Sequence, residues 1–145
     1  MENITKDMGV FVETNDDGSA KNVGLELLAP GKMLATKQGG NVVAVVIGNN
    51  VASAVEDASA HGADKVIVCE HPLLKDYTTD AYTKVICDVI EEMKPEAFLI
   101  GATNIGRDLA PRCAARLHTG LCADCTHLDV DMGIYRDFLK EASTL

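Results

Sequence analysis

Three polar residues that could hold an anion follow a short apolar run late in the chain. Thr103 and Asn104 supply hydrogen-bonding groups, and Arg107 adds a fixed positive charge, just after the buried-strand pattern of residues 98–100. In an α/β sheet, ligands usually bind between the end of a strand and the start of the next helix, and a helix N-terminus attracts anions. These residues are therefore the candidate site, either for an anion or for a protein interface.

The start of the next helix decides how long this loop is. Pro111 has no N–H, so it is tolerated in the first helical turn but would cost about 3 kcal/mol deep inside a helix. With Asp108 as N-cap, Pro111 falls in the first turn. The sequence thus predicts a loop Gly101–Arg107, in which Gly101 and Gly106 allow tight or positive-φ backbone. Its spacing matches neither standard glycine-rich phosphate motif, which weakens the case for a nucleotide.

The cysteines and histidines make a metal site unexpected and leave thiol redox chemistry through Cys122 and Cys125 as a weaker alternative. Cys122 and Cys125 match C-x-x-C, but the segment reads as a strand, in which residues three apart point to opposite faces. Cys69 and His71 border a loop without metal-ligand spacing. The chain also has no arrangement typical of a nucleophilic triad. It therefore reads as a binding or scaffold domain and not as an enzyme.

Composition limits the classes of binding partner and the cellular compartment that we expect for this chain. The net charge of −9 argues against nucleic acid and anionic membranes, which both require a basic face. No apolar run approaches the roughly 18 residues that span a bilayer, and residues 1–7 do not resemble a secretory signal. Five cysteines, mostly in apolar segments, fit buried thiols in a reducing cytoplasm.

Strand and helix patterns alternate along the chain. The helix at 22–37 contains Pro30-Gly31 and should be kinked or split there. Asn49 or Asn50 can cap the helix at 51–60, and the helix at 79–93 has the clearest apolar periodicity. Residues 120–130 read as further strand, and residues 135–145 as a short helix or irregular tail. The predicted strands are 8–14, 42–47, 65–69 and 97–100, and the last helix is 108–117.

This alternation predicts one α/β domain with a doubly wound, mostly parallel sheet and helices on both faces, Rossmann-like in the broad sense. We expect a single domain over 1–145, with its core at 8–131 and a tail at 132–145.

The chain resembles the N-terminal domain of the α subunit of bacterial electron transfer flavoproteins. The matching stretches are Gly9–Glu13, Leu25–Leu28, Gly62–Val66, and above all the pair Gly106–Arg112 (GRDLAPR) and Gly120–Thr126 (GLCADCT). Some bacterial members bifurcate electrons with two FADs and NADH, and the cysteine-rich composition is similar to that of sequences from anaerobes.

The resemblance implies a β-subunit partner and a complex that carries electrons on FAD between dehydrogenases and an acceptor. It also implies that FAD is held mainly by a C-terminal domain toward which the tail leads, so no FAD ligand is expected in these residues. Thr103, Asn104 and Arg107 would then lie at a structural edge near the subunit interface. The alternative is a free-standing adenine-nucleotide-binding module that uses the Gly101–Arg107 loop.

Overall fold

A four-stranded parallel sheet forms the centre of the computed structural model, which describes residues 5–118. The strand order is β3-β2-β1-β4, so the chain adds two strands on one side of β1 before it crosses to the other side. This reversal of direction between β1 and β4 is the mark of a doubly wound sheet. The strands are β1 Met8–Val12, β2 Val42–Gly48, β3 Lys65–Glu70 and β4 Ala97–Leu99.

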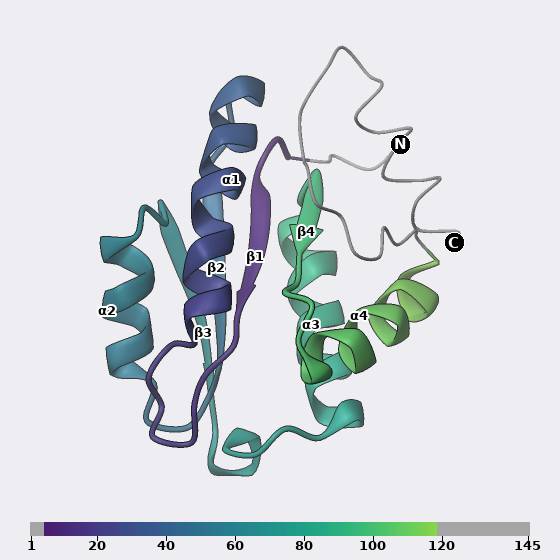
Figure 1. The fold of residues 1–145 in the computed structure, drawn as a ribbon. Coiled ribbons are helices and arrows are strands. Elements are labelled where there is room, and N and C mark those ends of the chain that lie inside the picture. Colours follow the sequence, from purple (N-terminus) through teal and green to yellow (C-terminus); the bar gives the residue numbers. More distant parts are fainter. Residues whose placement is uncertain (1–4, 119–145) are drawn as a thin grey trace.

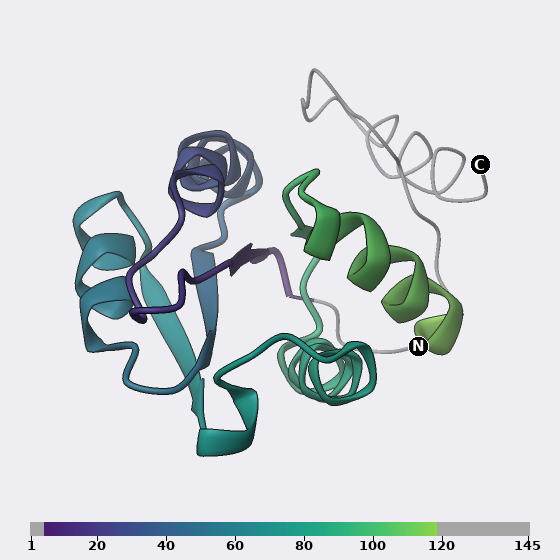
Figure 2. The same ribbon diagram turned by 60° about the horizontal axis from the view of Figure 1, so that its bottom comes forward.

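Helices cover both faces of this sheet (Figures 1 and 2). α1 and α2 pack on one face, and α3 and α4 pack on the other. The predicted α/β fold with helices on both faces is therefore confirmed. The helices are α1 Asn22–Gln38, α2 Ala52–Ala60, α3 Thr79–Met93 and α4 Asn104–Leu117, with a 3₁₀ turn, η1, at Pro72–Leu74.

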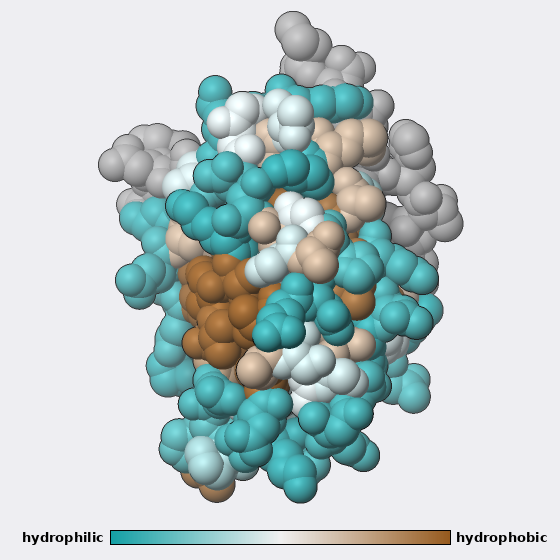
Figure 3. All heavy atoms as spheres, turned by 90° about the vertical axis from the view of Figure 1, so that its left-hand side faces the viewer, coloured by the Kyte–Doolittle hydropathy of each residue, from teal (hydrophilic) through white to brown (hydrophobic). Residues whose placement is uncertain are grey.

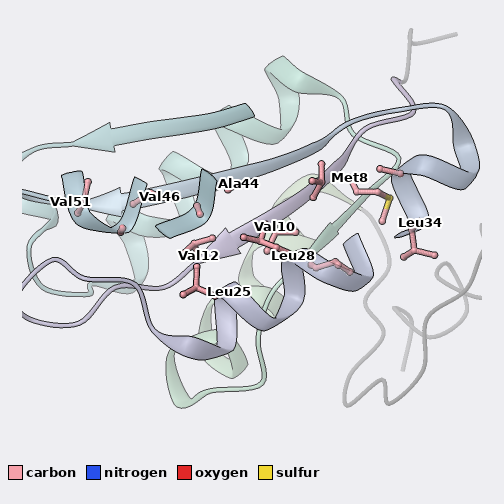
Figure 4. Packing of buried hydrophobic residues seen from close by; sticks show 14 residues of the cluster. Met8, Val10, Val12, Leu25, Leu28, Leu34, Ala44, Val46 and Val51 are labelled. Carbon is pink, nitrogen blue, oxygen red and sulfur yellow. The ribbon is translucent and has the colours of Figure 1, made fainter. Parts of the chain in front are cut away.

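Each face of the sheet has its own core. On the α1 and α2 face, Val10 and Val12 of β1 meet Leu25 and Leu28 of α1 (Figure 4). On the α3 and α4 face, a second cluster takes the alternate residues of the same strands. β1 and β2 are buried along their whole length because both of their sides are covered, as their unbroken apolar sequence predicts. The second cluster contains Phe11, Val45, Ile47, Leu74, Tyr82, Ile86, Cys87, Leu109 and Cys113.

The predicted break at Pro30-Gly31 does not split the first helix. α1 continues as one helix from Asn22 to Gln38, with Pro30 inside it. A side-chain carbon on Gly31 would lie 3.1 Å from methyl carbons of both Val10 and Val42. The missing side chain thus lets the helix lie close to the sheet, and this burial offsets the cost of the proline.

The predicted cap of α2 is also wrong. Its N-cap is Val51, which offers no side-chain hydrogen bond, and neither Asn49 nor Asn50 takes that place. The Glu70 carboxylate at the end of β3 accepts from the Val51 backbone N–H at 3.0 Å instead. A residue distant in sequence therefore caps this helix, and local spacing cannot reveal such a cap.

β3 is an outer strand of the described sheet. Figure 3 shows an apolar patch on the side of the molecule where α2 and β3 lie. Val68 of β3 is 43% exposed, and Leu73 of η1 is 79% exposed.

Within residues 5–118, no helix has the length and apolar character required to cross a bilayer. The strands expected at 120–130, the tail and the C-x-x-C pair lie outside the described residues.

Candidate functional site at the carboxyl edge of the sheet

A crevice of about 570 Å³ opens at the carboxyl end of β1, beside the point where the strand order reverses. Ligands of doubly wound sheets bind at such switch points. The walls come from the loop after β1, the loop after η1 and the first turn of α4. The lining residues are Phe11, Glu13, Thr14, Asn15, Asp16, Asp17, Lys21, Lys75, Asp76, Tyr77, Tyr82 and Ile105.

Glu13 is the buried charge of this crevice. It directly follows β1 and is only 5% exposed. Its Oε2 accepts from the Lys21 ammonium at 2.7 Å, and its Oε1 accepts from the Thr103 hydroxyl at 2.6 Å. A buried carboxylate is tolerated when it is paired and hydrogen-bonded, and here each oxygen has a donor.

Thr103 joins this carboxylate to the start of α4. Its Oγ1 donates to Glu13 and accepts from the backbone N–H of Gly106 at 3.0 Å, which makes Thr103 the N-cap. Gly106 itself lies so close to the preceding loop that a side-chain carbon there would be 1.8 Å from the Gly101 carbonyl oxygen. The close approach explains the glycine, since positive φ is found at neither Gly101 nor Gly106.

This geometry corrects the predicted helix start. α4 begins at Asn104 and not after Asp108, so the expected seven-residue loop Gly101–Arg107 does not exist. Pro111 lies well inside the helix, where it has no N–H to donate to the Arg107 carbonyl. The cap formed by Thr103 and its contact with Glu13 favour the early start and oppose the cost of the proline.

Asp108 has a different role from the predicted cap. From the second turn of α4, its Oδ2 accepts from the hydroxyls of Tyr77 and Thr79, each at 2.6 Å. The Thr79 and Tyr77 hydrogen bonds keep the pKa of Asp108 below its ordinary value. Burial and the Asp108 hydrogen bond raise the pKa of Tyr77 to about 12. Asp108 thus ties the loop before α3 to α4 and fixes one wall of the crevice.

Three aromatic rings, those of Phe11, Tyr77 and Tyr82, line the crevice and pack against one another. The Tyr82 ring meets Tyr77 edge-on with centroids 5.0 Å apart, and meets Phe11 at 6.4 Å. The buried Tyr82 hydroxyl donates to the Leu74 carbonyl at 2.6 Å. These rings connect the crevice to the core beneath the sheet.

The opposite wall is an acidic turn that is already hydrogen-bonded internally. Asp17 Oδ1 accepts from the Ser19 hydroxyl at 2.6 Å and from its backbone N–H at 3.0 Å, which lowers the pKa of Asp17. Asn15 donates from its side chain to the Ser19 hydroxyl. Four carboxylates and two lysines line the crevice, a charge balance that opposes binding of a phosphate group. The carboxylates are Glu13, Asp16, Asp17 and Asp76, and the lysines are Lys21 and Lys75.

The three predicted site residues lie together at the start of α4, Thr103 as its N-cap, but have different surroundings. Thr103 reaches Glu13, whereas Asn104 and Arg107 are exposed and do not line the crevice. The sequence reading missed Glu13 and Lys21. The signal available was a carboxylate placed directly after a buried strand, followed by a lysine just before a helix.

The thiols and histidines of the described part form no reactive centre. Cys87 and Cys113 are buried between α3 and α4, and burial raises the pKa of Cys113 to about 12, so this thiol stays protonated. The His71 ring accepts from the Leu73 backbone N–H at 3.0 Å and so caps η1. Among residues 5–118, no group of three or more His, Cys, Asp or Glu side chains could hold a metal ion.

Comparison with known families gives one match across most of the chain. Residues 8–140 match the electron transfer flavoprotein domain. This range includes the crevice, the first turn of α4 and the buried strands.

Individual relatives agree with this match. An acryloyl-CoA reductase electron transfer subunit beta from Anaerotignum propionicum is 57% identical over 143 residues, which are 99% of this chain and 39% of that protein. An electron transfer flavoprotein subunit alpha from Clostridium acetobutylicum is 52% identical over 127 residues, 88% of this chain and 38% of its own length. The protein FixB of Rhizobium meliloti is 44% identical over 130 residues, 87% of this chain and 36% of that protein. The chain thus spans about two fifths of the length of such relatives.

Proposed function

This chain belongs to the electron transfer flavoprotein family, and we propose that it is the subunit-contacting, N-terminal domain of an α subunit whose heterodimer carries electrons on FAD between dehydrogenases and an acceptor. The observation that carries the proposal is the match over residues 8–140 together with close relatives named as α subunits. The family consists of electron carriers, and we assign no catalytic role to this domain.

We propose further that this domain holds no FAD of its own. The switch-point crevice is the natural place for a cofactor phosphate, yet its central donors, Lys21 and Thr103, are engaged by Glu13. The surrounding charge is mainly acidic. Flavin in the complete complex would then be bound by other parts of the protein.

The exposed start of α4 is the surface we assign to the β-subunit partner. Asn104 and Arg107 are exposed in its first turn, and Arg112 and Arg116 follow on exposed positions of the same helix. Arginine suits interfaces because its planar guanidinium pairs with carboxylates in two parallel hydrogen bonds. The free-standing nucleotide-binding module is not favoured, since residues 104–107 of the loop on which it depends form the first turn of α4.

We also place the protein in the cytoplasm. Cys69, Cys87 and Cys113 are free thiols, which a reducing compartment preserves.

Two measurements test the proposal. The purified 145-residue chain should show no flavin absorbance after addition of FAD and gel filtration, and it should copurify with a co-expressed β subunit. Arg107→Glu should reduce the recovered complex at least tenfold, whereas Lys75→Glu, a charge reversal on the crevice wall, should not. Stoichiometric flavin on the isolated chain would overturn the assignment, as would failure to associate with the β subunit.

A further inference from the structure

The Glu13 carboxylate lies where an external anion would bind in a doubly wound domain. It follows β1 at the switch point and contacts Thr103, the N-cap of α4. The start of a helix favours a negative charge nearby, and the Glu13 carboxylate is connected to the start of α4 through the Thr103 hydroxyl. In this chain that charge comes from the protein itself.

Both oxygens of Glu13 engage groups that would otherwise be suited to phosphate. Oε2 takes the Lys21 ammonium at 2.7 Å, and Oε1 takes the Thr103 hydroxyl at 2.6 Å. The two donors come from residues 8 and 90 positions away in sequence, so the carboxylate joins three separate segments. It is only 5% exposed and lines the crevice of about 570 Å³.

We infer that the Glu13 carboxylate takes the position that a bound anion would otherwise occupy. It thereby excludes phosphate-bearing ligands from the crevice of this domain. The inference deepens the proposed function and rests on it, because it gives a physical reason why this domain would leave FAD to other parts of the protein. Repulsion by the carboxylate and competition for Lys21 and Thr103 both oppose an incoming phosphate.

The inference predicts that an external anion can replace the missing carboxylate. In Glu13→Ala, Lys21 loses its counter-charge, Thr103 loses its acceptor, and the space of the side chain becomes free. Inorganic phosphate should then stabilise the variant in a saturable way, with an apparent Kd at least tenfold below that of the wild-type chain. AMP should bind by the same phosphate group.

A matched control separates this local effect from the change in net charge. Asp76→Ala also removes one carboxylate from the crevice wall, but Asp76 does not engage Lys21 or Thr103. It should gain no more than about twofold in phosphate affinity, and potassium chloride at equal ionic strength should not reproduce the Glu13→Ala response. Adding Lys21→Gln to Glu13→Ala should remove most of the gain.

The readout is the melting temperature as a function of phosphate concentration, followed by calorimetric titration with AMP. If Glu13→Ala does not fold, Glu13→Ser also removes the charge and frees most of the space while it keeps a polar group there, and it should again bind phosphate more tightly than wild type. Equal phosphate responses of wild type and the folded Glu13 variant would overturn the inference. That failure would leave the β-subunit and flavin measurements untouched, so the two proposals fail separately.

Discussion

At the scale of single residues, the hydroxyl of Thr103 has two tasks that are normally separate. It caps α4 by accepting from Gly106, and it supplies a donor to the buried Glu13 carboxylate. An N-cap contributes about 1 kcal/mol, and a hydrogen bond to a charged group about 1.5–3 kcal/mol. One small side chain therefore connects the end of β1 with the start of α4.

Thr103→Val keeps the shape of the side chain and removes both hydrogen bonds. We expect the free energy of unfolding to fall by about 2–3 kcal/mol, measured by urea denaturation. Thr103→Ser retains the hydroxyl and should stay within about 0.5 kcal/mol of wild type. Equal stability of the Val and Ser variants would show that neither bond contributes.

The buried thiol of Cys113 gives a second prediction at this scale. Its pKa is about 12 in the folded chain against an ordinary value of 9.0. The unfolded chain therefore loses this proton first, and the free energy of unfolding should fall as the pH rises from about 9 to about 12. Below pH 9 the contribution is fully present.

Cys113→Ala removes this titration. Its stability should decline with pH less steeply than that of wild type, by at most about 1.4 kcal/mol per pH unit. Groups far from Cys113 cancel in this comparison, whereas Cys87, whose thiol donates to the Cys113 carbonyl, contributes to the difference. Cys69→Ala, at a partly exposed position, should change the slope less. Parallel profiles for wild type and Cys113→Ala would contradict the prediction.

At the scale of elements, α4 contains an unfavourable interior proline, and its contacts with the rest of the fold offset the cost of that proline. Pro111 is exposed inside the helix, whose start is fixed by Thr103 and whose second turn is held by Asp108. An interior proline costs about 3 kcal/mol relative to alanine, while it recovers about 0.4–1 kcal/mol by restricting the unfolded chain.

Pro111→Ala should therefore raise the free energy of unfolding by about 2–2.5 kcal/mol. Pro95→Ala is the matched control. Pro95 lies beyond the end of α3, where a proline breaks no helical hydrogen bond, so its replacement should bring no gain. A loss of stability in Pro111→Ala would mean that the proline ring is needed for packing. Both variants can be compared by thermal denaturation.

The elements also show what the sequence can and cannot reveal. The buried strands β1 and β2 and the amphipathic α3 follow from apolar runs and periodicity within a few residues, so they were predictable. The start of α4 and the cap of α2 were predicted wrongly, since they depend on Glu13 and Glu70, which are distant in sequence. Only part of the candidate site was predictable, because local spacing does not reveal contacts between residues that are distant in sequence. Thr103 is marked by its local pattern, whereas its partner is 90 residues away.

At the scale of the whole molecule, the sheet separates two cores that share strands but not side chains. Leu28 is fully buried on the α1 face, and Ile86 is fully buried on the α3 face. Mutations at distant sites without shared partners add to within about 0.3–0.5 kcal/mol. Substitutions on opposite faces of the sheet should therefore have additive effects on the free energy of unfolding.

Leu28→Ala should cost about 2–5 kcal/mol and Ile86→Val about 0.5–1.5 kcal/mol, because each leaves a cavity in a packed core. In the double variant the two losses should add to within about 0.5 kcal/mol. Phe11 and Tyr82, whose rings touch within one core, provide the contrast. Phe11→Leu with Tyr82→Leu should deviate from additivity by about 0.5 kcal/mol or more. Strong coupling between Leu28 and Ile86 would mean that the sheet transmits packing changes between its faces, and a partner bound at α4 would then influence the α1 side as well.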